Sequence, residues 1–167
     1  LNIGTTIRNM GDYEKALEYG LKAVELSQSV EDHERMAEAR DQLGANYVFL
    51  ENYAKALFYY KQVLKTHLRV KKTPKIIRAK INVGFANLGL GRLKMADQYF
   101  QKAFTDLEQH PNERLYAYGL SNFAKLRNQQ GRYEEAIKMG LEVLKIERKS
   151  ANQFDTPFFL QLLSASY

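Results

Sequence analysis

Residues of the kinds that carry catalysis are few in this sequence, and they do not form a recognisable group. The 167 residues contain no cysteine and only three histidines, His33, His67 and His110. The histidines share no spacing, such as i and i+4, that would set two metal ligands on one helix face. The acidic pair Glu134-Glu135 opens an apolar helical pattern, where carboxylates interact favourably with the helix dipole. The sequence therefore predicts no enzyme, no catalytic residue, no metal site and no cofactor.

A basic run in the middle of the chain is the strongest charge feature. The net charge is +6, and eight basic residues with no acidic residue lie between Lys61 and Lys80. Clustered Lys and Arg bind nucleic-acid phosphates, but stacking on bases would need aromatic side chains within the run, and it has none. A solvated face explains such a run equally well. Nucleic-acid binding through residues 61–80 is kept as an alternative and is not the expected function.

Carboxamide side chains recur at a fixed spacing of forty residues, at Asn2, Gln42, Asn82 and Asn122. Each lies two residues before a small residue, at Gly4, Gly44, Gly84 and Ala124. Carboxamides one repeat apart can hydrogen-bond the backbone of an extended peptide without reading its side chains. An Asn at a tight helix crossing can instead bond the neighbouring helix, so both interpretations stay open for Asn82 and Asn122.

Two further features share the same period and define the elements that carry these carboxamides. Alanines recur at Ala16, Ala56, Ala96 and Ala136, and turn signals recur at Gly11, Gly91 and Gly131. A glycine just past the last helical turn supplies the positive φ that often ends a helix. Glu51 stands at the fourth turn position, so we expect that turn to be strained or closed differently. Three features in register predict a repeat of two helices.

The apolar spacing between these marks is helical, and nothing alternates with the period of two that a strand needs. We predict an all-α fold and no segment long and apolar enough to span a membrane. Thr73-Pro74 is expected to be an N-cap followed by proline at the first helical position. The predicted helices are Leu1–Asn9, Tyr13–Ser29, His33–Leu50, Tyr53–Val70, Pro74–Leu90, Leu93–Gln109, Asn112–Gln130, Tyr133–Lys149 and Pro157–Tyr167.

The pattern of a small residue, an Ala twelve positions later and an aromatic residue four positions after that resembles the tetratricopeptide repeat. Two copies match it well, Leu43-Gly44 with Tyr47, Ala56 and Tyr60, and Val83-Gly84 with Ala96, Phe100 and Ala103. The first and fourth copies depart from it, since Gly20 and Gly140 replace the aromatic residue. The period of forty exceeds the common thirty-four. It is similar to a subclass seen in kinesin light chains, Leu-Gly-Asn-rich adaptors and bacterial peptide-sensing regulators.

The resemblance implies a right-handed superhelical solenoid of antiparallel helix pairs, about 4.5 repeats long. The implied repeats are residues 1–31, 32–71, 72–111, 112–151 and 152–167. The first helix of each pair would line a concave groove that holds an extended peptide or a protein. In that subclass the carboxamide two residues before the small residue contacts the peptide backbone.

The family's inward positions give the candidate binding residues. Apolar members would supply pockets, Arg78 and Lys125 would meet an acidic group, and Glu38 and Asp41 a basic one. The full set is Asn2, Arg8, Glu38, Asp41, Gln42, Arg78, Ile81, Asn82, Phe85, Leu88, Tyr118, Asn122 and Lys125.

The expected function is a protein-binding or peptide-binding scaffold, acting as a regulatory or sensory module of a larger signalling protein. Both chain ends fall within helical patterns, so we expect a fragment of a longer protein. The expected location is the cytoplasm. A second alternative is self-association through the C-terminal end, where the apolar residues between Phe158 and Leu163 need cover.

Overall fold

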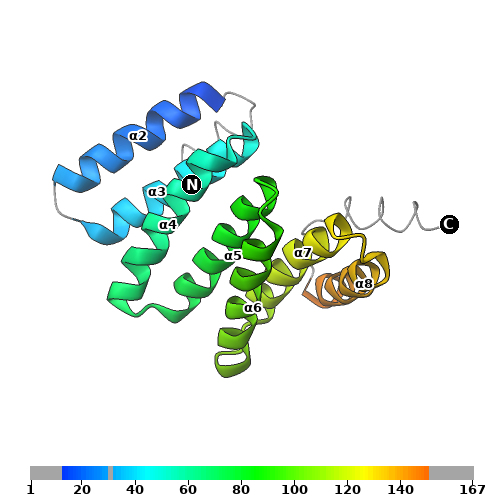
Figure 1. Cartoon of the computed structure of the whole chain (residues 1–167). Coiled ribbons are helices and arrows are strands. Elements are labelled where there is room, and N and C mark those ends of the chain that lie inside the picture. Colours follow the sequence, from blue (N-terminus) through cyan, green and yellow to red (C-terminus); the bar gives the residue numbers. More distant parts are fainter. Residues whose placement is uncertain (1–12, 30–31, 151–167) are drawn as a thin grey trace.

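A computed structural model describes residues 13–29 and 32–150 of the chain. Those residues contain no strand and form seven helices (Figure 1): α2 (Tyr13–Ser29), α3 (His33–Phe49), α4 (Tyr53–Val70), α5 (Thr73–Gly89), α6 (Leu93–Gln109), α7 (Glu113–Gln129) and α8 (Tyr133–Ser150). Each bound lies within one residue of its predicted position, which confirms the all-α prediction. The predicted helices Leu1–Asn9 and Pro157–Tyr167 lie outside the described residues.

Short polar side chains cap the start of three helices. Asp32 Oδ1 accepts hydrogen bonds from the backbone N–H groups of Glu34 and Arg35 at 3.1 and 2.9 Å. Asn52 and Asn112 each accept one from the N–H three residues later, at 3.1 and 2.9 Å. These bonds satisfy backbone donors that the first helical turn leaves unpaired. The prediction for α5 is wrong by one residue, because the helix already begins at Thr73 and the preceding Lys72 is the cap.

The turns inside the three helix pairs share one geometry. Glu51, Gly91 and Gly131 have φ of 54°, 69° and 74°. In each turn this residue donates its N–H to the carbonyl three residues back, at 2.9, 2.9 and 3.0 Å. The next residue donates to the carbonyl five residues back, at 2.8, 2.9 and 2.8 Å. The turn at Glu51 is therefore closed like the others, and a residue with a side chain adopts the left-handed conformation that favours glycine.

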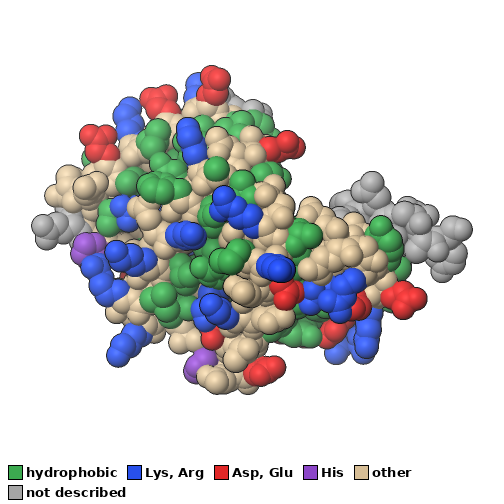
Figure 2. Space-filling view, viewed as in Figure 1, with side chains coloured by type: hydrophobic (Ala, Val, Ile, Leu, Met, Phe, Trp, Pro, Cys, Tyr) green, Lys and Arg blue, Asp and Glu red, His purple; other side chains and the backbone are tan. Residues whose placement is uncertain are grey.

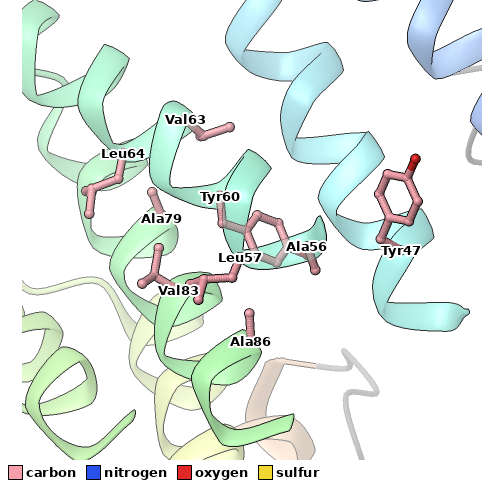
Figure 3. Close-up of a cluster of buried hydrophobic side chains, with 9 residues drawn as sticks. All are labelled: Tyr47, Ala56, Leu57, Tyr60, Val63, Leu64, Ala79, Val83 and Ala86. Atoms are coloured by element: carbon pink, nitrogen blue, oxygen red, sulfur yellow. The ribbon is translucent and has the colours of Figure 1, made fainter. Parts of the chain in front are cut away.

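Consecutive helices pack antiparallel along the chain, and α5 also packs directly against α7 (Figure 1). Apolar side chains between the layers form the core. Figure 3 shows one section of it, where Leu57 of α4 lies close to Val83 of α5 and the Tyr60 ring points toward α3. The four alanines that recur every forty residues, Ala16, Ala56, Ala96 and Ala136, are each 0% exposed. Burial at the same position of every pair lets each helix approach its neighbours closely.

In the pairs α3–α4 and α5–α6, the small residue packs against the aromatic residue of the same pair. A Cβ atom added to Gly84 would lie 2.7 Å from Phe100 Cε1, and one added to Gly44 would overlap the Tyr60 ring. At the fourth copy Ala124 carries a Cβ atom and Gly140 replaces the ring. Ala124 packs there in a cluster with Leu120, Val143 and Met139.

The described pairs α3–α4, α5–α6 and α7–α8 fall within the predicted repeats 32–71, 72–111 and 112–151. The number of repeats, their outer limits and the right-handed course of the superhelix stay predictions.

Candidate functional site

The first helices of successive pairs, α3, α5 and α7, form one layer of the solenoid. Helix α5 packs directly against α7, whereas α4, α6 and α8 make no comparable contact with one another within the described part of the chain. Side-chain hydrogen bonds and ion pairs join α3 to α5, and α5 packs against α7. We call this layer the inner layer, after the concave side that the repeat resemblance implies for first helices. The predicted binding residues that the structure describes all lie on these three helices.

A row of polar side chains crosses the inner layer from α3 to α7. Asp41 Oδ1 accepts a hydrogen bond from Asn82 Nδ2 at 3.0 Å, and Asn82 Oδ1 accepts one from the Tyr118 hydroxyl at 2.8 Å. Arg78 Nη2 lies 3.2 Å from Asp41 Oδ2. The side chain of Asn82 is mostly buried and links its two neighbouring helices. This arrangement favours the interpretation in which Asn82 bonds adjacent helices, and it positions Asp41 and Tyr118 on the inner face.

The row continues along α7. Asn122 Nδ2 donates to the backbone carbonyl of Tyr118 at 2.8 Å, one turn earlier on the same helix. Lys125 Nζ lies 5.6 Å from the centre of the Phe85 ring, within the range of a cation–π interaction. Phe85, Lys125 and Gln42 are each half-buried. Each of these three thus presents part of its surface to solvent from the inner layer.

Charged side chains bridge the starts of α3 and α5. Glu34 accepts hydrogen bonds from Lys72 and Lys75, each at 2.6 Å, and Lys75 Nζ also lies 3.0 Å from Glu38. The hydrogen bonds from Lys72 and then Lys75 lower the pKa of the Glu34 carboxyl to about 2. The predicted site residue Glu38 is exposed but already paired, so a basic ligand group would have to compete with Lys75 for it.

His67 is buried near these ion pairs. It is 2% exposed, and its Nδ1 atom makes no hydrogen bond. Burial, followed by the positive charge of Lys75, lowers the pKa of the imidazole below its usual 6.5. The ring is therefore held in its neutral form.

Four predicted binding residues are buried: Asn82 and Asn122 are 7% and 3% exposed, and Ile81 and Leu88 lie in the apolar core. Ile81 is 0% exposed and Leu88 is 3% exposed, and both pack among the buried side chains of α5, α6 and α7. Their place next to the inner face in the repeat pattern suggested exposure, but the close approach of α5 to α7 covers them. We leave both out of the candidate site. Asn2 and Arg8 lie outside the described residues.

A cavity of about 550 Å³ opens between the starts of α5 and α7. Its lining combines apolar and basic side chains and includes no acidic residue. The lining residues are Pro74, Lys75, Arg78, Asn112, Arg114, Leu115 and Tyr118.

Of that lining, sequence reasoning singled out only Arg78 and Tyr118 as binding residues. For Pro74 and Arg114, the forty-residue register did contain a signal. Glu34 of α3 aligns with Pro74 of α5 and Arg114 of α7, so the charge at this position changes from one repeat to the next.

Within residues 13–29 and 32–150, no group of three His, Asp or Glu side chains is arranged to hold a metal ion. None of the seven described helices is both long enough and apolar enough to cross a membrane.

A family comparison agrees with this geometry. Residues 1–68 match the sequence model of the tetratricopeptide repeat. The match covers less than half of the chain, and the described helices have a tetratricopeptide-like fold. The resemblance stated from the forty-residue pattern is thus confirmed. No curated protein matches the chain.

Solved structures show the same repeat architecture. A Rap conjugation gene regulator of the plasmid pLS20, in complex with the Phr* peptide, has a TM-score of 0.77 and 21% identity, covering 85% of this chain and 40% of its own. Aspartyl phosphate phosphatase F from Bacillus subtilis has a TM-score of 0.79 and 15% identity, covering 97% and 43%. A putative kinesin light chain from Podosopora anserina has a TM-score of 0.71 and 13% identity, covering 90% and 74%.

The chain thus spans about two-fifths of the length of the first two of these proteins. At such identities the likeness shows the fold alone.

Proposed function

We propose that this solenoid binds an extended peptide or protein segment on the inner face formed by α3, α5 and α7. It does so without catalysing a reaction, as a regulatory or sensory module of a larger signalling protein. One observation carries the proposal: half-buried polar and aromatic side chains continue across the first helices of three successive pairs, from Gln42 through Phe85 to Lys125. Such a row offers hydrogen-bonding groups and apolar contacts at repeat spacing, which suits an extended chain.

Two of the similar structures support this choice by their names. The pLS20 regulator was solved in complex with a peptide. A second, a Rap protein complexed with competence and sporulation factor, has a TM-score of 0.75. Another neighbour is named a phosphatase, and we take up the peptide-bound neighbours instead because the inner face offers a row of binding groups. A cytoplasmic location is part of the proposal and rests on the family resemblance.

The contacts of the basic run weaken the nucleic-acid alternative. Its second half lies on α5 and is used inside the chain, where Lys75 pairs with Glu34, Arg78 with Asp41, and Lys80 Nζ lies 2.5 Å from Asp106. These pairs leave fewer cations for phosphates than the sequence suggested. Self-association through the C-terminal end depends on residues outside the described ranges and stays a prediction.

The test begins with random nonapeptides displayed on phage and selected against the 167-residue chain. The affinity of the selected peptides is then measured by fluorescence anisotropy. The groove variant replaces Glu38 and Lys125 with alanine. The control replaces Glu108 and Lys94, which are exposed on α6, so both variants lose one acidic and one basic side chain.

We expect the groove variant to bind selected peptides at least about thirtyfold more weakly and the control to bind like the wild type, because truncating each of the two contact residues costs roughly 1–2 kcal/mol at an interface. Failure to select any peptide, or equal affinity of the two variants, would remove the inner face as the binding site.

A further inference from the structure

The cavity between α5 and α7 has a counterpart one repeat earlier that ion pairs bridge. At the junction of α3 and α5, Glu34 and Glu38 of α3 pair with Lys72 and Lys75. Forty residues on, the two acidic residues become Pro74 and Arg78. The ion pairs of the first junction therefore have no equivalent at the second. A cavity of about 550 Å³ lies there.

The replacements also set the chemistry of the cavity. On the α7 side, Lys72 becomes Asn112, Lys75 becomes Leu115, and Arg78 becomes Tyr118. The cavity thus has an apolar wall of Pro74, Leu115 and Tyr118 beside its basic side chains. A ligand group that fits must be both anionic and attached to something apolar.

The basic side chains of the lining differ in how far they are already neutralised. Lys75 pairs with two carboxylates, and Arg78 pairs with Asp41 through one of its nitrogens. Arg114 is exposed and makes no ion pair or hydrogen bond with any other described residue. A guanidinium carries five donors in a planar fork that suits a carboxylate, so Arg78 and Arg114 together retain donors for an incoming anion.

The surface over the central helices is also positively charged. In the view of Figure 2, Lys and Arg side chains gather over the middle of the face, and acidic side chains lie mainly toward its rim. A basic centre raises the local concentration of an anionic ligand and speeds its approach.

We infer that this cavity receives an acidic side chain of the bound peptide together with a neighbouring apolar residue. The carboxylate pairs with Arg78 and Arg114, in the role that Glu34 and Glu38 fill one junction earlier. The apolar neighbour packs on Pro74, Leu115 and Tyr118. This inference rests on the proposed function and adds to it a preference for acidic peptides.

The test uses four pools of nonapeptides with acetylated and amidated ends and no Asp or Glu outside the central position. The central residue is Glu, Gln, Lys or Leu, so the Glu side chain is the only carboxylate in its pool. Binding to the full chain is measured by fluorescence anisotropy. The variant R114E reverses one exposed charge of the lining, and K94E makes the same charge change on α6, away from the cavity. A fifth pool has central Gln and a free C-terminus.

We expect the wild type and K94E to bind the Glu pool at least about fivefold more tightly than the Gln pool, and R114E to prefer the Lys pool. Equal binding of the Glu and Gln pools would overturn the inference and leave the proposed function standing. If K94E also lost the preference for the Glu pool over the Gln pool, the preference would come from the net charge of the chain and not from the cavity. Tight binding of the pool with a free C-terminus would indicate that the cavity binds a C-terminal carboxylate and not an acidic side chain, which would contradict the inference. Binding of none of the pools would contradict both proposals.

Discussion

Replacing Glu51 with glycine should stabilise the chain by about 1 kcal/mol. Three turns share one geometry, in which Glu51, Gly91 and Gly131 adopt positive φ and the same two backbone hydrogen bonds close the turn. A residue with a Cβ in the left-handed region costs roughly 1–2 kcal/mol. Glycine removes that cost but adds about 0.5–1 kcal/mol of unfolded-state entropy.

The cost at these turns is conformational rather than steric. A Cβ atom added at Gly91 would meet nothing within 4 Å. The reciprocal change G91A should therefore destabilise the chain by about the amount that E51G stabilises it. A change of this size corresponds to roughly 2–4 °C in melting temperature for a chain of this length.

Urea unfolding followed by far-ultraviolet circular dichroism measures the free energy of unfolding of each variant. E51A is the matched control, because it removes the same carboxylate but keeps a Cβ atom. We expect E51A to unfold near the wild-type midpoint and E51G at higher urea. Equal midpoints for E51A and E51G would refute the argument, since the gain would then come from losing a charge.

Three further predictions follow from buried contacts. G84A should lower the free energy of unfolding by about 1–3 kcal/mol, because the new Cβ would lie 2.7 Å from a Phe100 ring atom, and urea unfolding against the wild type measures the loss. Y118F should cost about 1 kcal/mol in the same assay, since it removes the hydroxyl that donates to Asn82 Oδ1. H67L should reduce the loss of stability on acidification. Because the folded pKa of His67 lies below 6.5, the unfolded chain binds the proton first, so this loss starts as pH falls through 6.5. Melting temperatures between pH 7.5 and 5 should then fall less steeply in H67L than in the wild type.

The helix bounds could be predicted from sequence because local signals and tertiary packing agree. The alanine and glycine positions recur every forty residues, and each described bound lies within one residue of its predicted position. The start of α5 was misplaced, because Thr73-Pro74 is an equally good pattern for a cap and for a first turn. The conformation at Glu51 was left open, since the sequence alone does not tell whether a turn tolerates a positive φ or changes its closure.

The site was less predictable because exposure depends on how closely two helices approach. Ile81 and Phe85 are four residues apart on the same side of α5, yet Ile81 is 0% exposed and Phe85 is half-buried. Burial of a charge is equally hard to read from the pattern. Arg127 is 8% exposed because Asp97 accepts its Nη1 hydrogen bond at 2.7 Å and its guanidinium lies over the Phe123 ring.

In this solenoid the positions that recur set the packing of the helices, and the positions that vary set the charge at each junction. Ala56 and Ala96 are constant because every helix pair must bring its two layers equally close. Inner positions such as Glu34 and Arg114 are free to change from repeat to repeat, because each junction between first helices needs only its own charge balance. Where Glu34 and its cationic partners lie opposite each other, the junction is closed within the chain. Where the acidic residues are replaced, the same geometry leaves a basic cavity, and an external carboxylate can complete it.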